Sequence, residues 1–140
     1  MSKRKMKYLI ISLLALSLLV VVAVAVVNSL SLRRSQASIK DSILQLTPIG
    51  MDMENVIAVI ESKRKWKVEY ISYEHGFTRP GRPDPNDIAS GWGSVVGEKS
   101  IRVFLGDYRN IFITSVSVFW GFDADSKLID VHVWKDKDVL

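Results

Sequence analysis

The chain has 140 residues, no cysteine and a formal net charge of +4, which excludes disulfides, cysteine nucleophiles and cysteine zinc sites. The charge is unevenly divided: residues 1–40 carry seven Lys/Arg and no acid, whereas residues 41–140 carry 12 Lys/Arg and 15 Asp/Glu. Nucleic-acid binding needs a basic surface on the folded part of a chain, so this mildly acidic remainder argues against it.

An uncharged apolar run, residues 8–27, follows the basic segment 1–7. As a helix it would be about 30 Å long, the thickness of the hydrocarbon core of a bilayer. The basic segment favours a cytoplasmic N-terminus, with the rest of the chain outside the cytoplasm. We therefore expect a single-pass protein of the cell membrane that contacts lipid through this helix.

Two interpretations of the apolar run remain open. It is either an uncleaved transmembrane anchor or a signal peptide cleaved after Ala23-Val24-Ala25. The run continues through Val26 and Val27, which favours the anchor. Residues 28–37 are then a serine-rich linker, and residues 38–140 are one extracytoplasmic domain of common size.

Two short helices are expected at the start of this domain. Residues 38–46 place Ile39, Ile43 and Leu46 on one apolar face, and Pro48 ends that helix. Asp52 is the expected N-cap of a second helix, whose terminal lysines and arginine suit the helix dipole. Its predicted buried stripe consists of Met53, Val56, Ile57 and Ile60.

Four strands are predicted after the helices, over residues 66–70, 101–105, 113–122 and 128–134, from their period-two alternation. The expected fold class is α+β, with two helices packed on one face of a four-stranded antiparallel sheet (ααββββ). The buried residues of the first strand should be Trp66, Val68 and Tyr70. In the longest strand, Val116, Val118 and Trp120 should share one face. In the last strand, Ile129, Val131 and Val133 should share one face and Leu128, Asp130, His132 and Trp134 the other. Trp66, Trp120 and Trp134 are expected in the core.

Residues 74–93 form a connection far longer than the usual 4–6 residues, so the segment is either a binding loop or a tolerated insertion. Its three prolines stiffen it, which lowers the entropy lost on binding. Arg79 and Arg82 can bind carboxylates, and Trp92 lies between glycines as an apolar anchor. We predict that Arg79, Arg82 and Trp92 contact an acidic protein partner.

A family resemblance accompanies this pattern. Pro48-Ile49-Gly50-Met51 leads into a helix with Val56, and the final strands contain Phe122-Asp123, Leu128-Ile129 and Val131. Residues 38–136 thus resemble the SmpA/OmlA (BamE-like) envelope proteins and the repeats of β-lactamase inhibitor proteins. The resemblance implies two helices on an antiparallel sheet and a role in binding proteins. The lipid-bearing cysteine of the outer-membrane members is missing, which implies an inner or sole cell membrane.

Patterns for catalysis or metal binding are weak. His75 and His132 lie in different elements, Asp123-x-Asp125 lacks the later ligands of a calcium loop, and the glycines of residues 91–97 precede no helix. We expect no enzyme, cofactor or metal site. The leading hypothesis is an anchored protein-interaction module for envelope assembly or maintenance. The alternative is an inhibitor or immunity-type protein that blocks an enzyme or toxin.

Overall fold

The computed structural model describes residues 2–81 and 93–138 and divides into two units, Met1–Arg33 and Arg34–Leu140. The first unit contains helix α1, Lys3–Ser31. Between Lys3 and Ala23 this helix is long and apolar enough to span a membrane, and its side chains are exposed throughout.

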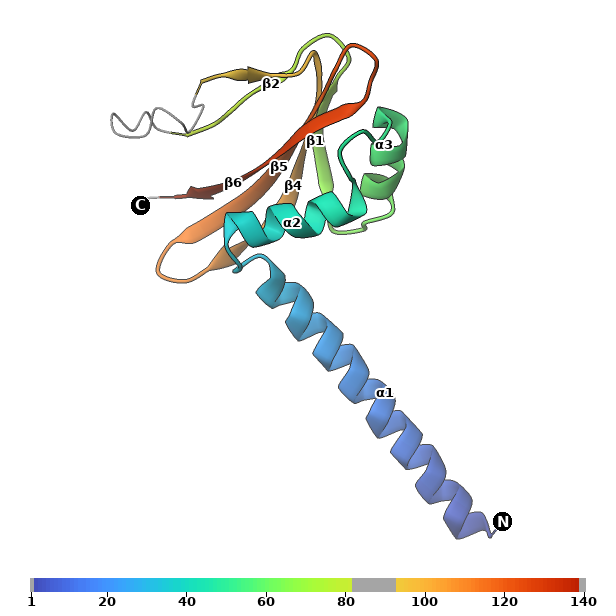
Figure 1. Ribbon diagram of the computed structural model, residues 1–140. Coiled ribbons are helices and arrows are strands. Elements are labelled where there is room, and N and C mark those ends of the chain that lie inside the picture. The colour runs from blue at the N-terminus through green and yellow to red at the C-terminus, as the bar shows by residue number, and fades with distance from the viewer. Residues whose placement is uncertain (1, 82–92, 139–140) are drawn as a thin grey trace. The chain divides into compact units, whose positions relative to one another are not determined.

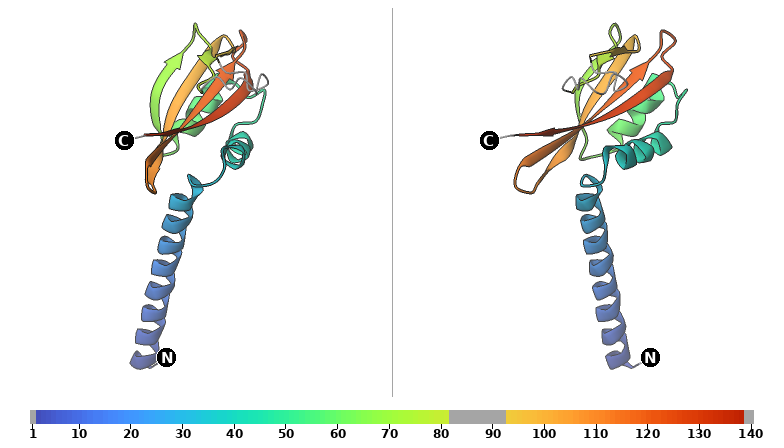
Figure 2. Two further views of the ribbon diagram at one scale, coloured as in Figure 1. Left: turned by 90° about the vertical axis from the view of Figure 1, so that its left-hand side faces the viewer. Right: turned by 60° about the vertical axis from the view of Figure 1, so that its left-hand side comes forward.

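The second unit is an α+β domain (Figure 1). Its helices are α2 (Gln36–Leu46) and α3 (Met53–Glu61). Its strands are β1 (Lys67–Ser72), β2 (Phe77–Thr78), β3 (Val95–Val96), β4 (Lys99–Arg109), β5 (Ile113–Phe122) and β6 (Leu128–Lys137). A twisted antiparallel sheet has the order β1-β4-β5-β6, which confirms the four predicted strands (Figure 2). Strands β2 and β3 form a separate hairpin that was not predicted.

Helix α2 begins at Ser35, whose side chain accepts a hydrogen bond from the Ser38 N–H, and it contacts β6. Ile39 and Ile43 are buried as expected, but the prediction for Leu46 was wrong because this side chain is exposed. Thr47, the C-cap residue, is fully buried instead. It follows Ile43 by four residues, which places it about 40° further around the helix axis, on the side of the buried stripe away from Leu46.

Helix α3 buries Met53, Val56 and Ile60, three of its four predicted core residues. Asp52 occupies the expected N-cap position, but its side chain makes no capping hydrogen bond. The carboxylate instead forms an ion pair with Lys127, 2.5 Å from Nζ. The charge of Asp52 therefore joins the start of α3 to the β5–β6 turn.

Trp120 lies at the centre of the core and is fully buried, as predicted. It pairs with Ile101 on β4 and with Val131 on β6, both fully buried. Its indole Nε1 donates a hydrogen bond to Thr47 Oγ1 over 3.0 Å. The Trp66 ring lies 6.2 Å away between centroids. One side chain thus joins three strands to the end of α2.

Bulges in two strands change the burial that was predicted for them. Val68 and Tyr70 were placed on one buried face, but a bulge between them turns them to opposite faces of the edge strand β1, where they are 44% and 38% exposed. A second irregularity, opposite Gly121 and Phe122, buries Leu128 and exposes Ile129. Trp134 was expected in the core. It is half-buried and pairs with Ser117, on the face opposite Trp120.

The β2–β3 hairpin packs on that second face of the sheet. Phe77 is buried against Phe119, with ring centroids 5.3 Å apart. Gly121 permits this approach, since a Cβ there would lie 2.9 Å from Val96 Cγ1 and 3.0 Å from the Phe77 ring. The small residue thus allows the hairpin to sit directly on β5.

Candidate functional site

Asp130 on β6 is a polar group of the second face that has several partners. Its carboxylate binds Arg79 over 2.7 Å, just after β2, and Lys40 of α2 over 3.2 Å. All three side chains are partly shielded from solvent. Three elements distant in sequence therefore meet at one carboxylate, and Arg79 fastens the hairpin to the sheet.

His132 lies beside this ion pair. Its ring is stacked near Phe77 and tilted relative to Phe119, with both centroid distances 6.3 Å. Burial lowers the pKa of His132, and the positive charges of Arg79 and Lys40 lower it further against the opposing effect of Asp130. These effects favour the neutral imidazole. Its Nε2 is buried and has no hydrogen-bond partner among the described residues, so this face contains a polar atom whose bonding capacity is unused.

A second ion pair borders the same aromatic group. Arg102 on β4 pairs with Glu69 on β1 over 2.5 Å, and its guanidinium carbon lies 5.1 Å from the centre of the Phe119 ring. We call Arg79, Arg102, Phe119, Asp130 and His132 the second-face cluster. It combines cations, an acid and aromatic rings on a rigid sheet, an arrangement suited to recognition of a partner surface.

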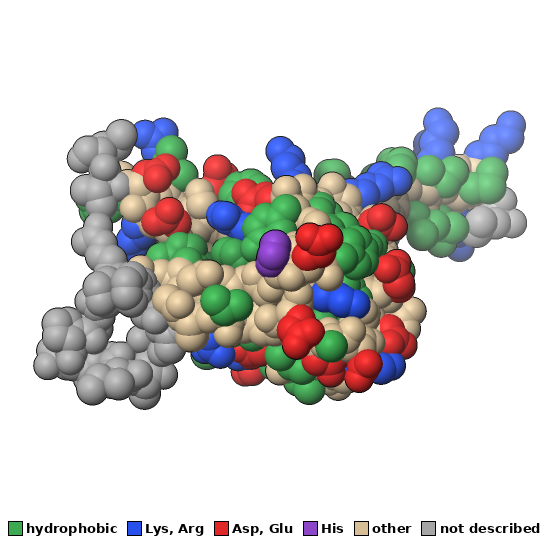
Figure 3. All heavy atoms as spheres, turned by 90° about the horizontal axis from the view of Figure 1, so that it is seen from above, with side chains coloured by type: hydrophobic (Ala, Val, Ile, Leu, Met, Phe, Trp, Pro, Cys, Tyr) green, Lys and Arg blue, Asp and Glu red, His purple; other side chains and the backbone are tan. Residues whose placement is uncertain are grey.

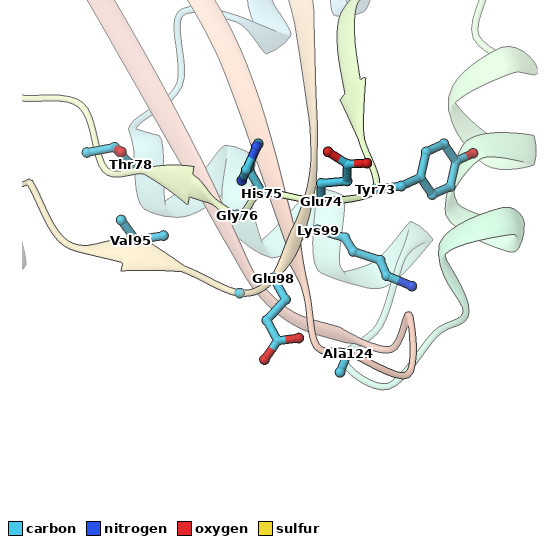
Figure 4. A pocket seen from close by; sticks show the side chains of 10 residues that line it. Tyr73, Glu74, His75, Gly76, Thr78, Val95, Glu98, Lys99 and Ala124 are labelled. Atoms are coloured by element: carbon cyan, nitrogen blue, oxygen red, sulfur yellow. The ribbon is translucent and has the colours of Figure 1, made fainter.

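A shallow cavity of about 570 Å³ lies at the end of the domain formed by the β1–β2, β3–β4 and β5–β6 turns. Glu74, His75, Glu98 and Lys99 line it, but Figure 4 shows Glu98 pointing away from Glu74 and His75. Figure 3 views this end from above and shows acidic and basic side chains spread over it. These four side chains do not converge on a common point, as acid–base catalysis would require.

Of the predicted contact residues, the structure places Arg79 in the second-face cluster. Arg82 and Trp92 lie outside the described residues. The ends of their segment are held together, because the Arg79 N–H donates to Ser94 O over 3.0 Å and the Gly93 N–H donates to Arg79 O over 3.2 Å. The role of all three residues in binding stays a prediction.

Sequence reasoning assigned no role to His132 or Asp130. Both residues lie in an otherwise apolar strand, where they alternate with the buried Val131 and Val133. This alternation was the sequence signal that could have drawn attention to them. The Arg79 partner is 51 residues away from Asp130, and no local pattern reports such a pairing.

Comparison with protein-family models, with curated proteins and with solved structures finds no match. The resemblance to the SmpA/OmlA (BamE-like) envelope proteins therefore stays a prediction.

Proposed function

We propose that the chain is a non-enzymatic, single-pass protein of the cell membrane, whose extracytoplasmic domain binds another protein in envelope assembly or maintenance. The exposed apolar surface of α1 supports the membrane anchoring in this proposal. Thirteen large hydrophobic side chains between Met6 and Val22 are exposed. At about 1.5–3 kcal/mol for each side chain removed from water, lipid would stabilise this helix by tens of kcal/mol.

The proposed domain architecture has α2 and α3 as one layer over the Trp120 face of the sheet. The contact of α2 with β6 and the hydrogen bond between Trp120 and Thr47 support it, as does the burial of Met53, Val56 and Ile60. The helices would then occupy one face of the sheet and the β2–β3 hairpin the other.

The proposed contact surface is this segment, with Arg79, Arg82 and Trp92. Its closed base is a scaffold of the kind on which binding loops are commonly presented. Because Arg79 is paired with Asp130, its replacement would also loosen the hairpin. The sharper test therefore changes Arg82 and Trp92.

Cross-linking in membranes followed by affinity recovery of the full chain tests the binding role. Arg82→Glu and Trp92→Ala should each abolish recovery of the partner, while Arg64→Glu, the same charge change at an exposed position after α3, should not. Undiminished recovery with both loop variants would refute the contact surface. Recovery of resident membrane machinery supports the leading role, whereas a hydrolase or toxin supports the inhibitor or immunity-type alternative.

A reporter fused after Leu140 tests the topology. It should be active only outside the cytoplasm, and the mature mass should include residues 1–25. A soluble product beginning at Val26 would show a cleaved signal peptide, and a reporter active in the cytoplasm would refute the proposed orientation.

A further inference from the structure

The β4–β5 turn carries an uninterrupted apolar sequence at its tip. Ile111, Phe112 and Ile113 are 84%, 43% and 40% exposed. The turn is closed by a hydrogen bond from the Asn110 N–H to Phe112 O over 3.1 Å. Tight turns are usually built from Gly, Pro, Asn, Asp and Ser, and three exposed apolar residues in a row form a contact surface of the kind that has a partner. We call residues 110–113 the apolar tip.

The apolar tip lies at the end of the domain where the chain enters from α1. Lys135 Nζ donates one hydrogen bond to Arg34 O and a second to the Tyr108 hydroxyl over 3.2 Å. The Asp138 N–H donates to Ile113 O over 3.1 Å. The first residue of the domain is thus bonded to the strands that hold the tip.

Chain length limits how far this end can be from the last residue of α1. Ser31 ends the helix and Arg34 begins the second unit. Three trans peptide links span at most about 11 Å. The apolar run ends at Val27, four residues before Ser31, and those four helical residues add about 6 Å. Residue 34 is therefore within about 17 Å of the membrane surface at which the run ends.

The charges of the domain are divided along the same axis. The entry end has four cations and three acids: Arg34, Arg109, Lys135, Lys137, Asp107, Asp136 and Asp138. The opposite end, around the cavity and the β5–β6 turn, has two cations and six acids: Lys99, Lys127, Asp52, Glu54, Glu74, Glu98, Asp123 and Asp125. The ten residues of β5 separate the two ends by about 30 Å. An anionic lipid surface attracts the first end and repels the second.

We infer that the apolar tip inserts into the headgroup layer of the membrane that holds α1, an inference that rests on the proposed anchoring. Ile and Phe side chains lose contact with water there, and nearby cations face lipid phosphates. The domain then has two attachments to the bilayer, one covalent through residues 32–33 and one through the tip. The acidic end and its cavity are directed away from lipid.

Site-specific labelling of the full chain in vesicles tests this inference. The chain has no cysteine, so Ile111→Cys gives a single thiol for an environment-sensitive fluorophore. The vesicles contain phosphatidylcholine and phosphatidylglycerol, with or without lipids that carry a nitroxide at the headgroup or high on the acyl chain. Ala124→Cys, exposed in the β5–β6 turn, is the matched control, and Leu14→Cys reports on α1.

The label at residue 111 should show blue-shifted emission and lose intensity with nitroxide lipids, while the label at residue 124 should do neither. Adding Phe112→Asp to the Ile111→Cys chain should reduce the quenching, because a charge opposes insertion. Equal, water-like emission at residues 111 and 124, with the residue 14 label quenched, would overturn the inference and leave the anchor intact. An unquenched label at residue 14 would overturn both.

Discussion

Replacing Trp120 with Ala perturbs the core at its most connected point. The side chain is fully buried, pairs with Ile101 and Val131, and donates to Thr47. Removal of a buried Trp costs about 3–5 kcal/mol through lost burial and the cavity left behind. Domains of this size have a total stability of about 5–15 kcal/mol. The variant should therefore lose a large share of its free energy of unfolding.

The hydrogen bond to Thr47 is the smaller part of that loss. In the Trp120→Ala variant the Thr47 hydroxyl keeps its own hydrogen bond to Ile43 O, 2.9 Å away, so it is not left without a partner. Trp120→Phe retains most of the ring and removes the indole donor. A single buried hydrogen bond contributes about 0.5–1.5 kcal/mol, so Trp120→Phe should be much less destabilising than Trp120→Ala.

Thermal and urea unfolding of a soluble chain beginning at Arg34, followed by circular dichroism, measures both changes. At about 4–8 °C per kcal/mol, Trp120→Ala should lower Tm by more than about 12 °C. Trp134→Ala makes the same chemical change at a half-buried position on the other face and should cost less. Equal, small effects of the two alanine variants would refute the register that buries Trp120.

Three further predictions concern the second face and α2. Because the pKa of His132 is lowered in the folded chain, the unfolded chain binds more protons. The free energy of unfolding should therefore fall as the pH drops below about 6.5, the ordinary pKa of histidine. His132→Gln should weaken this pH dependence in urea titrations at several pH values, and an unchanged slope of unfolding free energy against pH would contradict the prediction. Gly121→Val should destabilise by about 1–3 kcal/mol, because the added side chain collides with Phe77 and Val96; a melting temperature equal to that of the parent would show that the hairpin does not pack there. Ser35→Ala removes the N-cap of α2 and should cost about 0.5–2 kcal/mol in the same unfolding assay, a loss that should be absent if α2 begins elsewhere.

Much of the domain could be predicted from local periodicity. The helical stripes containing Ile39, Ile43, Val56 and Ile60 and the alternation around Trp120 were sufficient to locate two helices and four strands. These segments are long enough to contain several repeats of their period, which makes the pattern easy to recognise. The tertiary contacts bury the same residues that the pattern marks as apolar, so they reinforce it.

The errors arise where the period is interrupted or too short. A bulge adds one residue to a strand and reverses the faces that follow, which is why Val68 and Tyr70 were assigned together and Leu128 was placed opposite Val131. Strands β2 and β3 have two residues each and cannot show an alternation. They form because Phe77 packs beside Gly121. This contact joins distant parts of the chain, so local sequence does not predict it.

The candidate site was less predictable for the same reason. The second-face cluster draws Arg79, Arg102 and Asp130 from three separate segments, and only the strand pairing brings them together. The exposed apolar sequence at residues 111–113 was visible in the chain, but sequence alone did not show that these side chains would remain uncovered.

The bulge in β1 has a consequence for how copies of the chain meet. Anchoring by α1 would confine the copies to the plane of the membrane, with their domains similarly oriented. This confinement favours pairing between the edge strands of neighbouring copies. β1 is such an edge, but its bulge interrupts the regular row of donors and acceptors that a neighbour would need, and Lys67 and Glu69 are charged and exposed along it. At the other edge, β6 is contacted by α2. Crowding in the plane of the membrane would therefore not drive these sheets into a continuous aggregate.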